Sequence, residues 1–264
     1  MIVAAAICPS PPLLAGELTG QADILPELRA ACTAAVTRLL AAAPEVVAVV
    51  GPAETTGPWD AAGQLSLASF APALRQGSPH SDYRDHQSDN SKRRDAGLAV
   101  APPSAAASSA APPLPLALGI GARLLDEAGY TGPRTLHGIG EDEPAAACLA
   151  LGQELAASAS RVALLAVGDG SARRSASAPG YLDERAAPFD EAVERAVRGG
   201  DLPALAALDP ALAADLLAAG RPAWQALAGA LSAPHAAAAA RLRTEVLYSD
   251  APLGVAYLVA TLVP

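Results

Sequence analysis

The sequence predicts an α/β fold with a mostly parallel central sheet, helices on both faces and a small appended helical lobe. Two apolar runs, residues 2–7 and 45–50, flank a long Ala/Leu segment over residues 22–43. The apolar residues that recur in that segment at helical spacing are Ile24, Leu28, Ala31, Ala35 and Leu39. The three pieces therefore form a strand, a helix and a strand, an arrangement that requires parallel strands and a right-handed crossover.

The same alternation returns further along the chain. In order, we expect a helix over 114–128, a short strand near Thr135 and Leu136, a helix over 144–157 and a strand over 161–167. The runs 2–7, 45–50 and 161–167 are almost continuously apolar, which is typical of strands in a sheet that is covered on both faces. We therefore predict that these three runs are buried parallel strands.

Residues 76–113 form a Ser-, Pro-, Ala-, Asp- and Arg-rich stretch with few large apolar side chains. We expect a disordered or loosely attached insertion, because so little apolar surface cannot offset the entropy lost on ordering the chain. The stretch should then be dispensable for folding, and limited proteolysis would test this.

After the last predicted parallel strand, residues 183–235 are expected to form the helical lobe. Asp201 and Asp209 are natural N-caps, and Pro210 suits the first position of a helix. The chain then closes with two β-rich runs, 243–248 and 254–262, which form either a hairpin or two sheet strands joined by a site loop.

Length and charge limit the function. The chain has 264 residues and a formal net charge of −9, so we expect a single domain that repels phosphate backbones and anionic headgroups. Nucleic acid and membranes are therefore not expected as partners. Because no apolar run approaches the roughly 20 residues of a spanning helix, and residues 2–7 lack the length and basic flank of a signal peptide, a cytoplasmic protein is expected.

The cysteines and glycines do not form a known metal-binding or dinucleotide-binding motif. Cys8, Cys32 and Cys148 show no metal-binding spacing and are expected to be small buried hydrophobes. Gly119 and Gly121 lack the third glycine of a dinucleotide fingerprint and lie inside a helical run.

Candidate site residues follow the predicted strands. In an open α/β sheet, ligands bind beyond the carboxyl ends of the strands, and four loops qualify: 8–12, 51–56, 168–175 and 248–250. The charged residues of these loops that could converge on one cleft are Glu54, Asp169, Arg173, Arg174 and Asp250. The alternative is that these polar residues serve only as turn formers.

The sequence is also compatible with two further functions, anion binding and hydrolysis. Arg173 and Arg174 follow a glycine turn and suit a carboxylate or phosphate ligand. His137, which we expect just after a short strand, could join Ser171 and Asp169 in a hydrolase triad, although Ser171 does not lie in a Gly-x-Ser-x-Gly elbow. The remaining histidines, His80, His86 and His235, lie in the insertion or at a helix start.

Three motifs resemble one superfamily. Residues 8–14 resemble the Pro-His-Pro-Pro-Leu-Leu opening of the class III extradiol ring-cleavage dioxygenase superfamily, which includes the Memo-like proteins. Residues 168–172 resemble its Gly-Asp-x-Ser-His loop, and residues 248–257 resemble its closing Tyr-x-x-x-Asp and Val-x-Tyr pattern. Order, spacing and loop position agree over most of the chain, outside residues 76–113.

The resemblance implies a nonhaem Fe(II) oxygenase of catecholic substrates, with the iron held by two His and a carboxylate and a further His as acid/base. In this chain Ser10 stands where the first ligand His falls, Ala53 or Glu54 where the second falls, and Ala172 at the acid/base position. We therefore expect a degenerate metal site without standard ring cleavage, and no cofactor.

The candidate catalytic residues are Asp169, Ser171 and His137, and no residue is assigned to a metal. The expected substrate-binding residues are Ser10, Glu54, Arg173, Arg174 and Asp250. Two alternatives remain: a non-catalytic scaffold that binds a small anion or a partner's tail, and a hydrolase or transferase that uses Glu54, Asp169 and His137.

Overall fold

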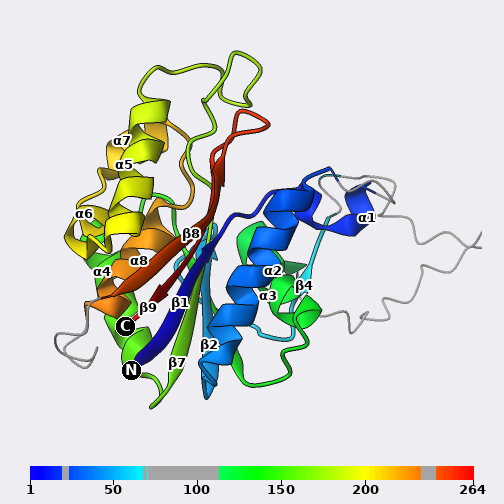
Figure 1. Ribbon diagram of the computed structural model, residues 1–264, viewed down its shortest axis with the longest axis vertical. Coiled ribbons are helices and arrows are strands. Elements are labelled where there is room, and N and C mark those ends of the chain that lie inside the picture. The colour runs from blue at the N-terminus through cyan, green and yellow to red at the C-terminus, as the bar shows by residue number, and fades with distance from the viewer. Residues whose placement is uncertain (20–23, 68–69, 71–112, 233–241) are drawn as a thin grey trace, which may run out of the picture.

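A seven-stranded sheet forms the centre of the molecule (Figure 1). The computed structural model describes residues 1–19, 24–67, 70, 113–232 and 242–264. Across the sheet the strands are β3 (Gly57–Trp59), β6 (Arg134–Ile139), β2 (Val46–Pro52), β7 (Val162–Val167), β1 (Ile2–Cys8), β9 (Tyr257–Val263) and β8 (Arg243–Asp250). The four strands β6, β2, β7 and β1 are parallel, whereas β3 and β9 run antiparallel to their neighbours.

Helices cover both faces of this sheet. One face packs against η1 (Pro12–Leu14), α2 (Pro26–Ala41) and α3 (Leu116–Glu127), with α1 (Gly16–Thr19) beside η1. The other face packs against α4 (Ala145–Ala157), α5 (Ala186–Gly199), α6 (Leu202–Ala206), α7 (Pro210–Asp215) and α8 (Arg221–Leu231). Figure 1 shows the two helical layers on opposite sides of the strands. The predicted α/β class is therefore confirmed.

The three strands predicted to be buried and parallel are β1, β2 and β7, and that prediction is confirmed. Their side chains are almost fully buried because helices cover both faces, as the continuous apolar runs require. The sheet also contains β6, which is six residues long, so the short strand expected near Thr135 and Leu136 extends further in both directions.

The first long helix begins later than predicted. Pro26 occupies the first turn of α2, where its missing N–H leaves no hydrogen bond unmade. Ile24 therefore precedes the helix and is 50% exposed, whereas the other apolar residues of the predicted stripe are buried.

The predicted helical lobe has the expected caps but is not wholly peripheral. Asp201 accepts a hydrogen bond from the N–H of Ala204, and Asp209 accepts one from Ala211. However, every residue of α8 is buried, and this helix packs against α4 and the strands β1, β2 and β7. The last of the lobe's helices is thus part of the layer that covers the sheet.

Of the two alternatives for the end of the chain, the structure shows paired antiparallel strands, with Asp250 opposite Tyr257. A separate two-stranded sheet joins β4 (Gln64–Leu65) to β5 (Pro113–Leu114). Pro113 therefore belongs to a strand, and the rest of the predicted insertion, with His80 and His86, lies outside the described residues, as does His235. Within the described part of the chain, the search for a helix with the length and apolar character to cross a membrane finds none.

Candidate functional site

A cleft of about 620 Å³ lies at the edge of the sheet where the parallel strands end. The loops after β1, β2, β6 and β7 meet there because the carboxyl ends of parallel strands share one edge. The residues that line the cleft are Ser10, Pro52, Ala53, Glu54, Pro115, Leu116, Ala117, Glu141, Asp142, Asp169 and Ala219. Three of the predicted site residues, Ser10, Glu54 and Asp169, are thus brought together.

A short hydrogen bond joins two of these loops at the base of the cleft. The backbone N–H of Ser10 donates to Oδ1 of Asp169 at 2.6 Å, and Ser10 is only 5% exposed. Burial of the Asp169 carboxyl raises its pKa to about 6, although hydrogen bonds from the Ser10 backbone and side chain oppose the shift. Asp169 is therefore a more basic carboxylate than an exposed one.

Tyr257 of β9 lies close enough to Asp169 to sense its charge. The pKa of the Tyr257 phenol is raised, first because the ring is buried and then because the negative charges of Asp169 and Tyr248 disfavour a phenolate. The phenol therefore stays protonated over the physiological range of pH.

The wall formed by the loop after β6 is held in place from two sides. Thr56 Oγ1 donates to Oε2 of Glu143 and accepts from the N–H of Gly140 at 2.9 Å. From beneath, the guanidinium of Arg221 donates to the carbonyl oxygens of Glu141 and Glu143, the latter at 2.6 Å. These bonds fix the loop that carries Glu141 and Asp142 into the cleft.

Glu141 and Asp142 are cleft residues that the sequence analysis does not assign. Both follow β6, and the same rule that selects Glu54 and Asp169 would select them if β6 were expected to reach Ile139. The signal is therefore present in the sequence but depends on the length of one strand.

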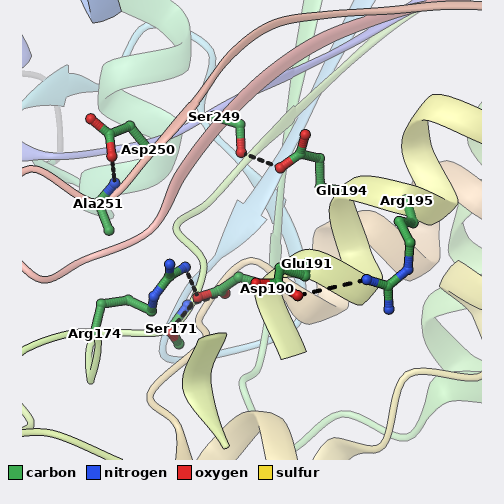
Figure 2. Close-up of polar contacts among 9 residues, drawn as sticks. All are labelled: Ser171, Arg174, Asp190, Glu191, Glu194, Arg195, Ser249, Asp250 and Ala251. Carbon is green, nitrogen blue, oxygen red and sulfur yellow. Dashed lines mark hydrogen bonds and ion pairs between the residues drawn. The ribbon is translucent and has the colours of Figure 1, made fainter. Parts of the chain in front are cut away.

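The predicted convergence on a single cleft is wrong for three of the five charged residues, namely Arg173, Arg174 and Asp250. Arg174 and Asp250 line a second cavity, of about 240 Å³, between α5 and the β8–β9 hairpin. Arg174 Nη1 lies 3.1 Å from Oδ2 of Asp190, and Ser171 Oγ donates to the same carboxylate at 2.5 Å (Figure 2). Arg173 lines neither cavity and donates to the carbonyl oxygen of Gly180.

The expected hydrolase triad is not assembled. His137 lies within β6, paired with Val50 and Pro58, and not in the loop after it. Burial lowers its pKa, and the charge that opposes this shift belongs to Glu154 of α4, on the face of the sheet. Strand β2 lies between β6, which carries His137, and β7, which leads to Ser171, so these two strands are about 10 Å apart. Ser171 is also fully buried and bonded to Asp190.

The donor set of the cleft does not fit the iron of the resembled family. Ser10 and Ala53 supply no imidazole, and Asp169 is already engaged by Ser10. In the described ranges, no three His, Cys, Asp or Glu side chains are grouped so that they could hold a metal ion. Fe(II) in such sites takes two imidazoles and a carboxylate, and this cleft offers carboxylates alone.

Comparison with known proteins provides no evidence about the function of this chain. No protein-family model matches the chain, and no curated protein matches it. Among solved structures, the chain is similar to one described as "Crystal structure of uncharacterized protein JW3007 from Escherichia coli K12", with 15% sequence identity, 99% of this chain and 100% of that chain covered, and a TM-score of 0.47. At that identity and score the likeness carries nothing about function.

Proposed function

We propose that this chain is a class III extradiol dioxygenase-like protein with a degenerate metal site, which binds a small catecholic molecule without the family's iron chemistry. The observation that carries the proposal is the 2.6 Å hydrogen bond between Ser10 and Asp169. It joins the two loops on which the resemblance chiefly rests, in a cleft that also contains Glu54.

The charge of the cleft selects the kind of ligand. Glu54, Glu141, Asp142 and Asp169 line it, and none of the described lining residues is Lys, Arg or His. Such a lining repels anions and accepts hydrogen bonds, so it favours an uncharged ligand with hydroxyl groups over the small anion considered from the sequence.

The apolar part of the cleft suits a flat ring. Pro52, Pro115 and Leu116 line the cleft beside the carboxylates. A catechol would place its ring against these side chains and direct its two hydroxyls to the acidic residues, since a carboxylate is a strong acceptor for a phenolic O–H. Asp169, which is partly buried, is the acceptor at the base of the cleft.

Isothermal titration of the metal-free protein with catechol and with 3,4-dihydroxybenzoate, without oxygen, tests the proposal. We expect catechol to bind about tenfold more tightly, because the carboxylate of the second ligand meets the acidic lining. Asp169→Asn should weaken catechol binding about tenfold, since an amide is a weaker acceptor than a carboxylate.

The matched control is Glu245→Gln, a carboxylate near the start of β8 at the opposite edge of the sheet, paired with Arg38. This variant should bind catechol as the unmodified protein does. Equal affinity for the two ligands, or no effect of Asp169→Asn, would contradict the proposal.

A further inference from the structure

Strand β8 forms a long edge of the central sheet. It has eight residues, pairs with β9 on one side and ends the strand order, lying between α5 and α2 (Figure 1). In the part of the chain that the structure describes, no backbone group of β8 bonds to a backbone group outside its ladder with β9. An edge strand with unpaired N–H and C=O groups is a template for pairing with another chain.

The two edges of the sheet differ in how well they suit such pairing. Strand β3 has three residues, and its central residue Pro58 lacks an N–H group. Strand β8 contains neither proline nor lysine, two residues that protect an edge. Its Glu245 carries a compensated charge, because Oε2 lies 2.6 Å from Nη1 of Arg38 in α2. The side chains of β8 therefore leave this edge open to a partner strand.

The sequence of β8 is complementary to itself in an antiparallel pairing centred between Val246 and Leu247. The facing residues are then Arg243 with Asp250, Thr244 with Ser249, and Glu245 with Tyr248. Arg243 and Asp250 are exposed, and neither forms an ion pair with a described residue. A two-fold axis would bring the cation at one end of each strand against the anion of the other copy, twice.

This register also requires facing residues to lie on the same face of the sheet. In a regular strand, residues an odd number of positions apart lie on opposite faces, so Thr244 could not face Ser249. The ladder with β9 is irregular between Val246 and Tyr248, and Leu247 has no partner in it. An extra residue of this kind shifts the alternation by one position and makes the register possible.

Side-chain contacts agree with this shift on the face toward α5. Thr244 Oγ1 donates to the carbonyl oxygen of Arg198 at 2.7 Å, and Ser249 Oγ donates to Oε2 of Glu194 at 2.6 Å. Both acceptors belong to α5. Thr244 and Ser249 therefore share a face.

The other two facing pairs lie on the side of α2. Glu245 contacts Arg38 of α2, and Tyr248 packs against the part of the core that α2 covers. Arg243 lines a groove of about 380 Å³ together with Arg38, and Figure 2 shows Asp250 directed away from Glu194 of α5. Each facing pair of the register thus shares a face.

We infer that this chain forms a two-fold symmetric dimer in which β8 pairs antiparallel with β8 of a second copy, with Arg243 facing Asp250 at both ends. The assembly closes at two copies because each copy uses its β8 edge once. The inference does not rest on the function proposed for the cleft, since β8 contributes no residue to the cleft's lining.

Sedimentation equilibrium and hydrogen–deuterium exchange of the full chain test the inference. The protein should pass from monomer to dimer as its concentration rises, and the β8 amides should then exchange more slowly, whereas those of β3 should not change. Arg243→Asp should weaken dimerisation by about tenfold or more, because two attractive contacts become repulsive. Arg123→Asp in α3, which packs against β2 and β4, makes the same change of net charge and should leave dimerisation unchanged.

Charge exchange tests the register. Arg243→Asp and Asp250→Arg should each dimerise poorly alone, but a mixture of the two proteins should form a heterodimer, because every facing pair then joins opposite charges. The double variant Arg243→Asp/Asp250→Arg should dimerise with itself. A monomer at every concentration, β8 amides protected equally at all concentrations, equal effects of the two Arg→Asp variants, or a mixture no more dimeric than its components would each overturn the inference.

Discussion

Two opposing effects act on Asp169 in the cleft. Removal of the carboxyl group from water disfavours its charged form, while hydrogen bonds from Ser10 favour it. Burial has the larger effect, and the pKa rises from 3.8 to about 6. The residue is thus ionised at neutral pH at the expense of folding stability, as expected of a group placed for binding and not for stability.

This balance predicts the pH dependence of stability. Because the folded pKa of Asp169 is raised, the folded state binds more protons than the unfolded state between about pH 4 and pH 6, so this residue makes the protein less stable as pH rises through that window. Asp169→Asn, which can still accept from Ser10, should therefore be more stable than the unmodified protein at pH 7, by about 1–3 kcal/mol.

Urea unfolding of both proteins at several pH values measures this difference. The advantage of Asp169→Asn should vanish below about pH 4, where the carboxyl is protonated in both states. A variant that is less stable at pH 7, or a difference that is the same at every pH, would show that burial does not dominate.

Arg221 is a second residue whose environment predicts a measurable effect. Its guanidinium is 1% exposed and donates to two backbone carbonyls of the loop after β6 and to Gln225 Oε1 at 3.0 Å. Arg221→Met keeps much of the length but leaves those carbonyls without a donor, so we expect a loss of about 2–4 kcal/mol of unfolding free energy.

Because the same loop carries Glu141 and Asp142, the Arg221→Met variant should also bind catechol more weakly. Arg185→Met, which removes an exposed guanidinium bonded to Asp183 and Asp215, is the matched control and should change stability by less than about 1 kcal/mol. Comparable losses in the two variants would rule out a special role for the buried residue.

At the scale of elements, α4 and α8 meet backbone to backbone. A Cβ atom added at Gly152 would lie 1.9 Å from the carbonyl oxygen of Ala226, and one added at Gly229 would lie 2.2 Å from that of Leu149. No side chain can move aside there, because the obstructing atoms belong to the other helix's backbone. The close approach explains how an alanine-rich helix becomes fully buried.

Gly152→Ala and Gly229→Ala should therefore each destabilise the fold, by about 2–4 kcal/mol, because the helices must separate. Gly199→Ala is the control: it ends α5, has nothing within 4 Å of the added Cβ, and should be neutral or stabilising by less than about 1 kcal/mol. Thermal unfolding of the three variants suffices, and a tolerated Gly152→Ala would contradict the close packing.

Some strands and helices of this fold can be predicted from the sequence, and others cannot. The strands β1, β2 and β7 are predictable because their apolar runs are uninterrupted, whereas His137 and Gly138 interrupt β6 and hide its true end. Helix α8 is expected in a peripheral lobe because it belongs to the run of short helices over residues 183–235, and its packing against α4 and the sheet is a tertiary property.

At the scale of the whole molecule, strand order decides which site residues meet. Ser10, Glu54 and Asp169 are predicted together because each follows a parallel strand of the sheet's centre. Asp250 ends β8, which β9 separates from β1, and Arg174 turns toward Asp190 in α5. Neither placement has a local signal, because Asp190 lies sixteen positions from Arg174 and edge-strand order is a tertiary property.

The fold also places the residues that stand at the iron-ligand positions of the family that the sequence resembles. The fold brings Ser10, Ala53 and Asp169 to the cleft from three different strands, so Ser10→His and Ala53→His would place two imidazoles at positions that the resemblance gives to iron ligands. With Glu54 or Asp169 as the carboxylate, the double variant should gain measurable Fe(II) binding.

Anaerobic calorimetric titration with Fe(II) is the most direct test of the claim that the cleft binds a catechol without iron. The unmodified protein should show no stoichiometric binding of Fe(II) in this titration. In a separate assay in air, it should not accelerate oxygen uptake by a mixture of catechol and iron. Tight binding of one Fe(II) per chain by the unmodified protein, or turnover of catechol, would contradict the account and restore the oxygenase.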